Sequence, residues 1–196
     1  MTSLAKAATV LIALMSVSLN AGIADAATLS SASVALSDPR PSATSVNYTF
    51  TGSSVTSTNI KCVKAVFSTT PTGDTAPTSW DGSAGTITAA SSTLVNSSAT
   101  GWTLATSDGT SSTGQKNIWQ YTNSTGVTPS TTTGATFIMA GITNSNTADT
   151  AYYLKLTTYS NTNCSTGPVD NATVEFINTN GSTLSLTVDN LSLIHI

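Results

Sequence analysis

Apolar and polar residues alternate in short runs along most of the chain, and turn-forming residues separate the runs. This period of two is typical of antiparallel strands that turn one face toward a core and the other toward water. No stretch shows the periodicity of an amphipathic helix. The runs that predict strands are residues 32–36, 46–51, 60–67, 102–106, 117–122, 135–142, 152–159, 172–177 and 182–188.

About eight to ten short strands in a single domain favour two packed sheets. We therefore predict an all-β fold, an antiparallel two-sheet β-sandwich of the immunoglobulin-like or jelly-roll-like kind. Between the last two runs, Asn180 and Gly181 predict a type I′ hairpin turn, with Leu184, Leu186 and Val188 on the inward face of the final strand. Residues 69–85 and 124–134 are rich in Pro, Gly, Ser and Thr, and predict the loops that carry function.

The N-terminus has the pattern of a secretory leader. A short segment with Lys6 precedes the uncharged apolar run AATVLIALMSVSL, and the small residues Ala24 and Ala26 follow it. The apolar run is shorter than the roughly 20 residues that span a bilayer, which disfavours a retained anchor. We predict a signal peptide over residues 1–26, a single domain over 27–190, no membrane span in the mature chain, and a secreted or cell-surface location.

If the chain is exported as predicted, its two cysteines are expected to be oxidised. On the oxidising side of a membrane, Cys62 and Cys164 are expected to form an inter-strand disulfide. Two sulfurs and a single histidine fall short of the four ligands of a structural zinc site. We therefore expect neither a metal nor a cofactor.

Charge excludes one class of partner. Only 8% of the residues are charged and the net charge is −3, whereas about 25% of an average soluble domain is charged. No basic run interleaves with aromatic residues, so nucleic acid is not an expected partner.

Few side chains could perform catalysis. There is no nucleophile elbow, and the segment GSAG at residues 82–85 predicts a turn. Glu175 alternates with Val174 and Phe176 and is expected to face solvent. Asp81 and Asp108 each precede a glycine, as turn aspartates do. We predict no catalytic residue, and a secreted hydrolase is the least favoured function.

The last six residues, LSLIHI, contain His195, the only histidine of the chain. They can be read from the codons CTG TCT CTT ATA CAC ATC, the start of a transposase end sequence that tags DNA for short-read sequencing. We predict that residues 191–196 are translated adapter, that His195 has no role, and that the frame is truncated after about Asn190. The alternative is a genuine final strand.

Loop and strand aromatics are the best binding candidates. Trp80, in the segment SWDG beside Asp81, could stack on a sugar ring, or could fold back as a lid over the core. Tyr153 and Tyr159 are opposite in parity to their apolar strand neighbours, so at least one is expected to be exposed. Trp102 and Trp119 lie in predicted strands and are expected in the core.

Lysines within strands leave one covalent alternative open. Lys61, Lys64 or Lys155 could form an isopeptide crosslink with an asparagine, assisted by Glu175, although the spacing selects no pair. The ordinary alternative is that these lysines keep strand edges soluble.

The segments ATLSSASVALSDPRPSATSVNYTF, IKCVKAVFSTT and YYLKLTTYSNTNCSTGPVDNATVEFINTNGSTLSLTVD resemble a group of uncharacterised secreted proteins found mainly in metagenomic assemblies of small-genome bacteria. The resemblance covers nearly the whole mature chain, including both cysteines, and implies no established activity. In these relatives the final strand continues past LTVD, which agrees with an adapter-derived tail.

We expect a non-catalytic surface or structural protein, adhesive or a subunit of an extracellular filament or coat. Its N-terminal segment TLSSASVAL, residues 28–36, would be an exchangeable edge strand that pairs with another copy of the chain. The alternative is a carbohydrate-binding module that uses loop aromatics on surface glycans.

Overall fold

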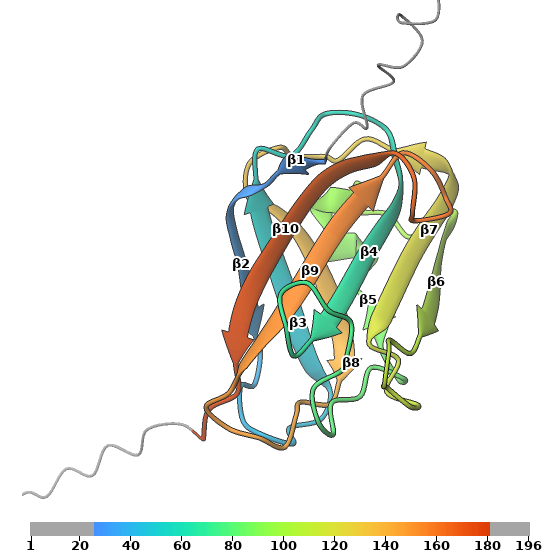
Figure 1. The fold of residues 1–196 in the computed structure, drawn as a ribbon. Coiled ribbons are helices and arrows are strands. Elements are labelled where there is room, and N and C mark those ends of the chain that lie inside the picture. The colour runs from blue at the N-terminus through green and yellow to red at the C-terminus, as the bar shows by residue number, and fades with distance from the viewer. Residues whose placement is uncertain (1–25, 181–196) are drawn as a thin grey trace, which may run out of the picture.

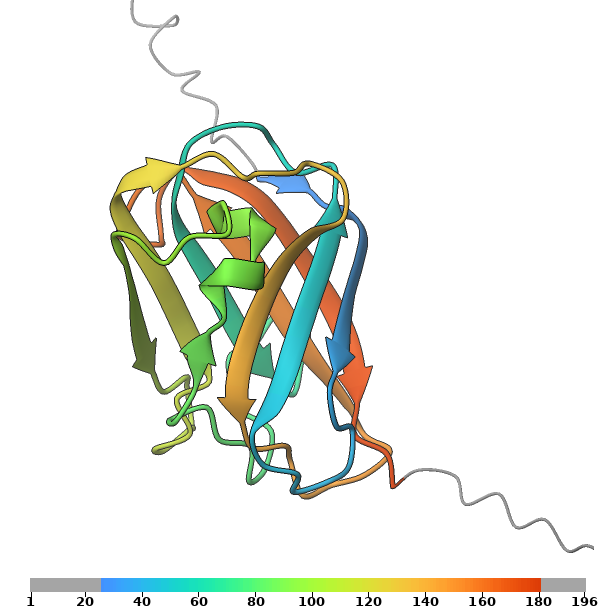
Figure 2. The ribbon, with the colours of Figure 1, turned by 180° about the vertical axis from the view of Figure 1, so that it is seen from behind.

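The computed structural model describes residues 26–180, which form a two-sheet β-sandwich (Figure 1). One sheet has six strands in the order β1-β10-β9-β4-β7-β6, and the other has four in the order β2-β3-β8-β5. The strands are β1 (Ala27–Thr28), β2 (Ser30–Leu36), β3 (Val46–Ser53), β4 (Ile60–Ser68), β5 (Thr86–Ile87), β6 (Trp102–Ser107), β7 (Ile118–Val127), β8 (Ala135–Ile142), β9 (Ala151–Tyr159) and β10 (Pro168–Ile177). Two short 3-10 helices, η1 (Ala89–Ser91) and η2 (Thr93–Val95), lie beside β8, as the view from behind shows (Figure 2).

The predicted sandwich is confirmed, and each predicted run within residues 26–180 overlaps a strand. The run 182–188, with Leu184, Leu186 and Val188, lies outside the described residues. Pattern alone missed β1, β5 and the two 3-10 helices, which are too short to show a period. The predicted loop 124–134 begins too early, because β7 continues to Val127. One pair also departs from the antiparallel prediction, since β1 runs parallel to β10.

Alternation along the strands builds the core. In β9, Tyr152, Leu154 and Leu156 are buried between the sheets, and the residues between them face outward. Phe67 of β4 occupies the centre of the core. Its ring lies 4.5 Å from the ring of Trp80 and 5.4 Å from that of Tyr48.

The N-terminal segment passes from one sheet to the other. Ala27 and Thr28 pair with the start of β10, and the Leu29 amide donates to the Asn171 carbonyl at 2.9 Å. From Ser30 onward the chain pairs with β3 instead, with a register shift between Ser30 and Ser33. Figure 1 shows β2 at the side of the sandwich, next to β10.

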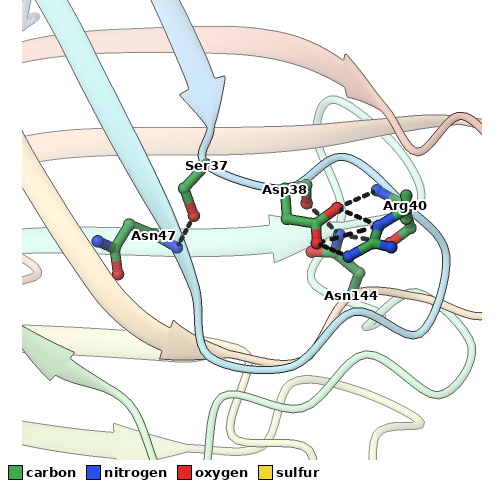
Figure 3. A network of polar contacts seen from close by, with 5 residues as sticks. All are labelled: Ser37, Asp38, Arg40, Asn47 and Asn144. Carbon is green, nitrogen blue, oxygen red and sulfur yellow. Dashed lines mark hydrogen bonds and ion pairs between the residues drawn. The ribbon is translucent and has the colours of Figure 1, made fainter. Parts of the chain in front are cut away.

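The loops at one end of the sandwich are tied together by Asn144 (Figure 3). Its side-chain amide donates to the Asp38 and Arg40 carbonyls, both at 2.8 Å. Its oxygen accepts the Tyr48 hydroxyl at 2.7 Å, and burial raises the pKa of that phenol. The β2–β3 and β8–β9 connections are thereby fixed to each other.

Candidate functional site

The cysteines form the expected disulfide, with Cα atoms 5.6 Å apart, but it joins a strand to a loop rather than two strands as predicted. Cys62 lies in β4 and pairs in register with Tyr159 of β9. Cys164 lies in the loop that joins β9 to β10, so the bond fastens this loop to the outer face of the six-stranded sheet. Both cysteines are buried.

Trp80 does not have the exposed geometry that sugar stacking needs. Its ring is 0% exposed and packs against Phe67, as the lid alternative anticipates. The prediction of a ligand-binding indole at this position is therefore wrong. Asp81 forms an isolated bridge with Thr143, and its carboxylate accepts the Ser83 amide at 2.7 Å. These contacts show that Asp81 serves a turn, as the glycine after it predicts, while a ligand-binding role for its carboxylate stays a prediction.

Trp102 and Trp119 are core residues, as predicted. The Trp102 ring stacks on Tyr121 with ring centroids 4.9 Å apart, and the Trp119 indole donates to the Lys116 carbonyl at 2.8 Å. The indole nitrogens of Trp80 and Trp102 are buried and have no hydrogen-bond partner among the described residues.

Tyr153 and Tyr159 both lie on the outer face of the six-stranded sheet and are half-buried there. Register places Tyr153 opposite Glu175 of β10 and Tyr159 opposite Cys62 of β4. Burial raises the pKa of Tyr159, and a hydrogen bond with Thr157 partly offsets that effect. Both side chains therefore point outward, as their parity predicts, but both stay partly buried and neither is fully exposed.

The outer face of this sheet is hollowed into a cavity of about 380 Å³, which we call the outer groove. Its floor consists of the outward side chains of three adjacent strands: Lys64, Val66, Ile118, Lys155 and Thr157. Tyr159 lies at one side, and residues 72–74 of the β4–β5 connection cover the other. Figure 1 shows this connection passing in front of β4 and β9.

The covering loop is held in place by a buried amide. Asn117 is 0% exposed, and its amide group donates to the Phe67 carbonyl at 2.8 Å and to the Asp74 carbonyl at 2.6 Å. Its oxygen accepts the Gly109 amide at 2.8 Å. A Cβ added at Gly109 would lie 1.8 Å from the Asp74 oxygen, so the two loops can approach this closely only because residue 109 is a glycine.

The charged residues that line the outer groove are Lys64, Lys155 and Asp74. The Asp74 carboxylate accepts the Thr110 amide at 3.1 Å and the Thr110 hydroxyl at 3.3 Å. Lys155 makes only a 3.5 Å contact with the Thr72 carbonyl, and Lys64 has no hydrogen-bond or ion-pair partner within residues 26–180. The groove therefore presents cations that its own side chains do not neutralise.

A second hollow lies over the β2–β3 connection, residues 38–44. Its two charged side chains neutralise each other, since Arg40 binds the Asp38 carboxylate through bonds of 2.6, 3.0 and 3.1 Å (Figure 3). The bonds from Arg40 lower the pKa of Asp38 to about 2. This hollow offers a ligand less unpaired charge than the outer groove.

The carboxylates are spread over several elements, since Asp38 and Asp108 lie in loops whereas Asp170 and Glu175 lie in β10. Asp108 accepts the amides of Lys116 and Gly114, at 2.9 and 3.0 Å, and these bonds lower its pKa to about 2. Each of the two cavities contains one carboxylate, whereas glycoside hydrolysis uses a pair. Within residues 26–180 no group of three or more His, Cys, Asp or Glu side chains could hold a metal ion.

The isopeptide alternative requires a buried lysine, and none of its three candidate lysines is fully buried. Lys61, Lys64 and Lys155 are only partly buried, and Glu175 faces solvent as its alternation predicts. A crosslink of this kind needs a desolvated amine to attack the amide, and solvent reaches all of these groups.

The described part of the chain contains no helix of the length and apolar character needed to cross a bilayer. No protein-family model and no curated protein matches this chain. The resemblance to secreted metagenomic proteins stays a prediction.

Proposed function

We propose that this protein is a non-catalytic extracellular structural module that assembles with copies of itself by exchanging its N-terminal edge strand. The leader pattern and the disulfide support a place outside the cytoplasm, because such bonds persist in oxidising compartments. The observation that carries the proposal is the shallow attachment of the segment that contains β1 and β2.

Little apolar surface holds this segment in its own domain. Between Ala27 and Leu36 only Leu29 is buried, at 4% exposure, while Ala32, Val34 and Leu36 pack against the core from partly exposed positions. β3 next to it alternates between buried and outward positions along most of its length. The segment is therefore joined to the sheets mainly by backbone hydrogen bonds, which an identical segment from another copy could form equally well.

The segment also lacks the residues that normally protect an edge. It contains neither lysine nor proline, the side chains that discourage edge-to-edge pairing. A register shift between Ser30 and Ser33 is one protective device that it retains, and Ser31 there has φ of 49°. Beyond this shift, Val34 to Leu36 pair regularly with β3.

The opposite edge of the four-stranded sheet is closed. Beyond the two-residue strand β5, the Ser92 hydroxyl accepts the Ile138 amide and the Thr93 hydroxyl accepts the Thr136 amide, both at 2.9 Å. These hydroxyls occupy donors that an added strand would need. In this sheet the N-terminal edge is therefore the side open to exchange.

Disulfide trapping tests the exchange directly. Ala35 of β2 pairs with Thr49 of β3, so the variant Ala35→Cys with Thr49→Cys places two thiols across this boundary. The protein would be purified after export, concentrated, oxidised gently and run on a denaturing non-reducing gel. Exchange joins different chains and gives a ladder of covalent oligomers.

The control is Thr49→Cys with Ile138→Cys, which joins β3 to β8, two strands that remain in one domain under either hypothesis. This variant should give only crosslinked monomer. If Ala35→Cys with Thr49→Cys also gives only monomer, and light scattering shows a single monomeric species at high concentration, strand exchange is rejected.

The loop indole gives no support to a carbohydrate-binding role, since Trp80 is buried. The separate carboxylates likewise give no support to a hydrolase.

A further inference from the structure

We propose that the outer groove binds a sugar that carries a single carboxylate, such as a uronic acid. The groove lies on the outer face of β4, β7 and β9, in the interior of the six-stranded sheet. The N-terminal strand does not line it, so this site is independent of the proposed assembly.

The two lysines that line the outer groove favour a negatively charged ligand. Lys64 is directly opposite Thr157, and Lys155 is directly opposite Val66, so the two lysines are diagonal neighbours on adjacent strands. Such positions are about 7–8 Å apart, close enough for the ammonium groups to repel each other. A carboxylate placed between them would relieve this repulsion and accept from both.

Neither lysine is already committed to a partner of opposite charge. Both salt bridges among the described residues involve other groups, Arg40 with Asp38 and Lys116 with Asp108. Glu175 is a diagonal neighbour of Lys155 on the β10 side, but it is exposed, lies outside the groove and makes no ion pair with Lys155.

The Asp74 carboxylate favours a sugar as the ligand over an anion of higher charge. It is fixed by Thr110 and still has lone pairs free, which sugar hydroxyls can occupy as donors. The same negative charge opposes phosphate or sulfate groups at this side of the groove. Two cations and one anion leave a net charge of +1, which matches a single carboxylate.

The size and lining of the groove suit one or two sugar rings. Its volume of about 380 Å³ falls at the lower end of the range for small-molecule sites. Ile118 and Tyr159 supply apolar surface for the C–H face of a sugar, above the nearly buried Val66, and Thr157 supplies a hydroxyl. Because Asn117 holds the covering loop, the groove exists before any ligand binds.

The test is an NMR titration of the exported, ¹⁵N-labelled protein with glucuronic acid, glucose and inorganic phosphate. We expect saturable shifts for residues around the groove with glucuronic acid, at least tenfold weaker binding of glucose, and weaker binding at high ionic strength. The variant Lys64→Gln with Lys155→Gln should weaken glucuronic acid binding at least tenfold.

Two matched controls separate the groove from general surface effects. Lys61→Gln removes a positive charge from the same strand outside the groove, and should leave affinity unchanged. Tyr159→Leu should weaken binding severalfold, whereas Tyr153→Leu, on the same strand face but outside the groove, should not. Thermal unfolding of each variant verifies that it is folded.

Several outcomes would overturn the proposal. These are no saturable binding of glucuronic acid by the wild type, equal binding of glucose, and binding of phosphate as tight as that of glucuronic acid. Unchanged affinity in folded Lys64→Gln with Lys155→Gln would also reject the site.

Discussion

Reduction of the Cys62–Cys164 bond should destabilise the protein mainly through its unfolded state. The bond closes a loop with a sequence separation of 102 residues, for which the chain-entropy relation gives about 4.7 kcal/mol at 25 °C. A single domain is commonly stable by only about 5–15 kcal/mol, so the loss should be a large fraction of the total. Comparing oxidised with reduced wild type keeps every side chain the same and isolates the covalent bond.

Urea unfolding followed by tryptophan fluorescence is the assay. Trp80, Trp102 and Trp119 are 0%, 9% and 1% exposed, so their emission reports on the core. Reduction should lower the unfolding midpoint and raise the m-value, because the unconstrained unfolded chain exposes more surface. The variant Cys62→Ala with Cys164→Ala is the control, and the reductant should not affect it.

Folding and unfolding rates test whether the disulfide acts through the unfolded state. Cys62 pairs with Tyr159, and Cys164 follows in the next loop, so the bond holds β4 and β9 close together before they pair. Reduction should therefore slow refolding more than it speeds unfolding. A loss of stability below about 1 kcal/mol, or a change confined to the unfolding rate, would refute this entropic reasoning.

Two further changes test the core and the surface charges. Phe67→Ala should lower the free energy of unfolding by about 3–5 kcal/mol, because it empties the centre of the aromatic core, whereas Thr173→Ala on the exposed face of β10 should stay within about 0.5 kcal/mol in the same urea assay. Hydrogen bonds lower the pKa of Asp108 from 3.8 to about 2, so its stabilising contribution is present above pH 3.8 and is lost as the pH falls toward 2. Asp108→Asn should therefore melt below the wild type at pH 6, with the gap closing toward pH 2, and melting curves that keep a constant gap would contradict this assignment.

Local pattern was sufficient to predict the longer strands, but not the two-residue strands β1 and β5 or every strand boundary. In β9, the alternation of Tyr152, Tyr153, Leu154 and Lys155 predicts which side chains face the core, because adjacent residues of a strand point to opposite sides. The same rule placed Glu175 toward solvent. It failed at β1, where two residues are too few to show a period. It also failed at the end of β7, where a segment rich in Ser, Thr, Gly and Pro suggested a loop although the strand continues to Val127.

The candidate site depended on which strands become neighbours. Tyr159 was a candidate from its parity, but nothing near it in the sequence indicates that Lys64 of β4 and Asp74 of the following loop line the same groove. Trp80 is the opposite case, a predicted site residue that the fold removes from the surface. Its position in a glycine-rich loop suggested an exposed ring, but the fold buries the ring against Phe67. Long-range contacts decide both cases, and they leave no mark on local periodicity.

The sequence by itself therefore determined the all-β class, the strand faces and the pairing of the two cysteines, because alternation is local and the chain has only one pair of thiols. Tertiary structure alone decided that the N-terminal segment crosses between the sheets, that the edge at β8 is closed by hydroxyls, and that two lysines share a groove. These features arise from register between strands distant in sequence. Many registers satisfy the same alternation, and only the packing of the whole core selects one of them.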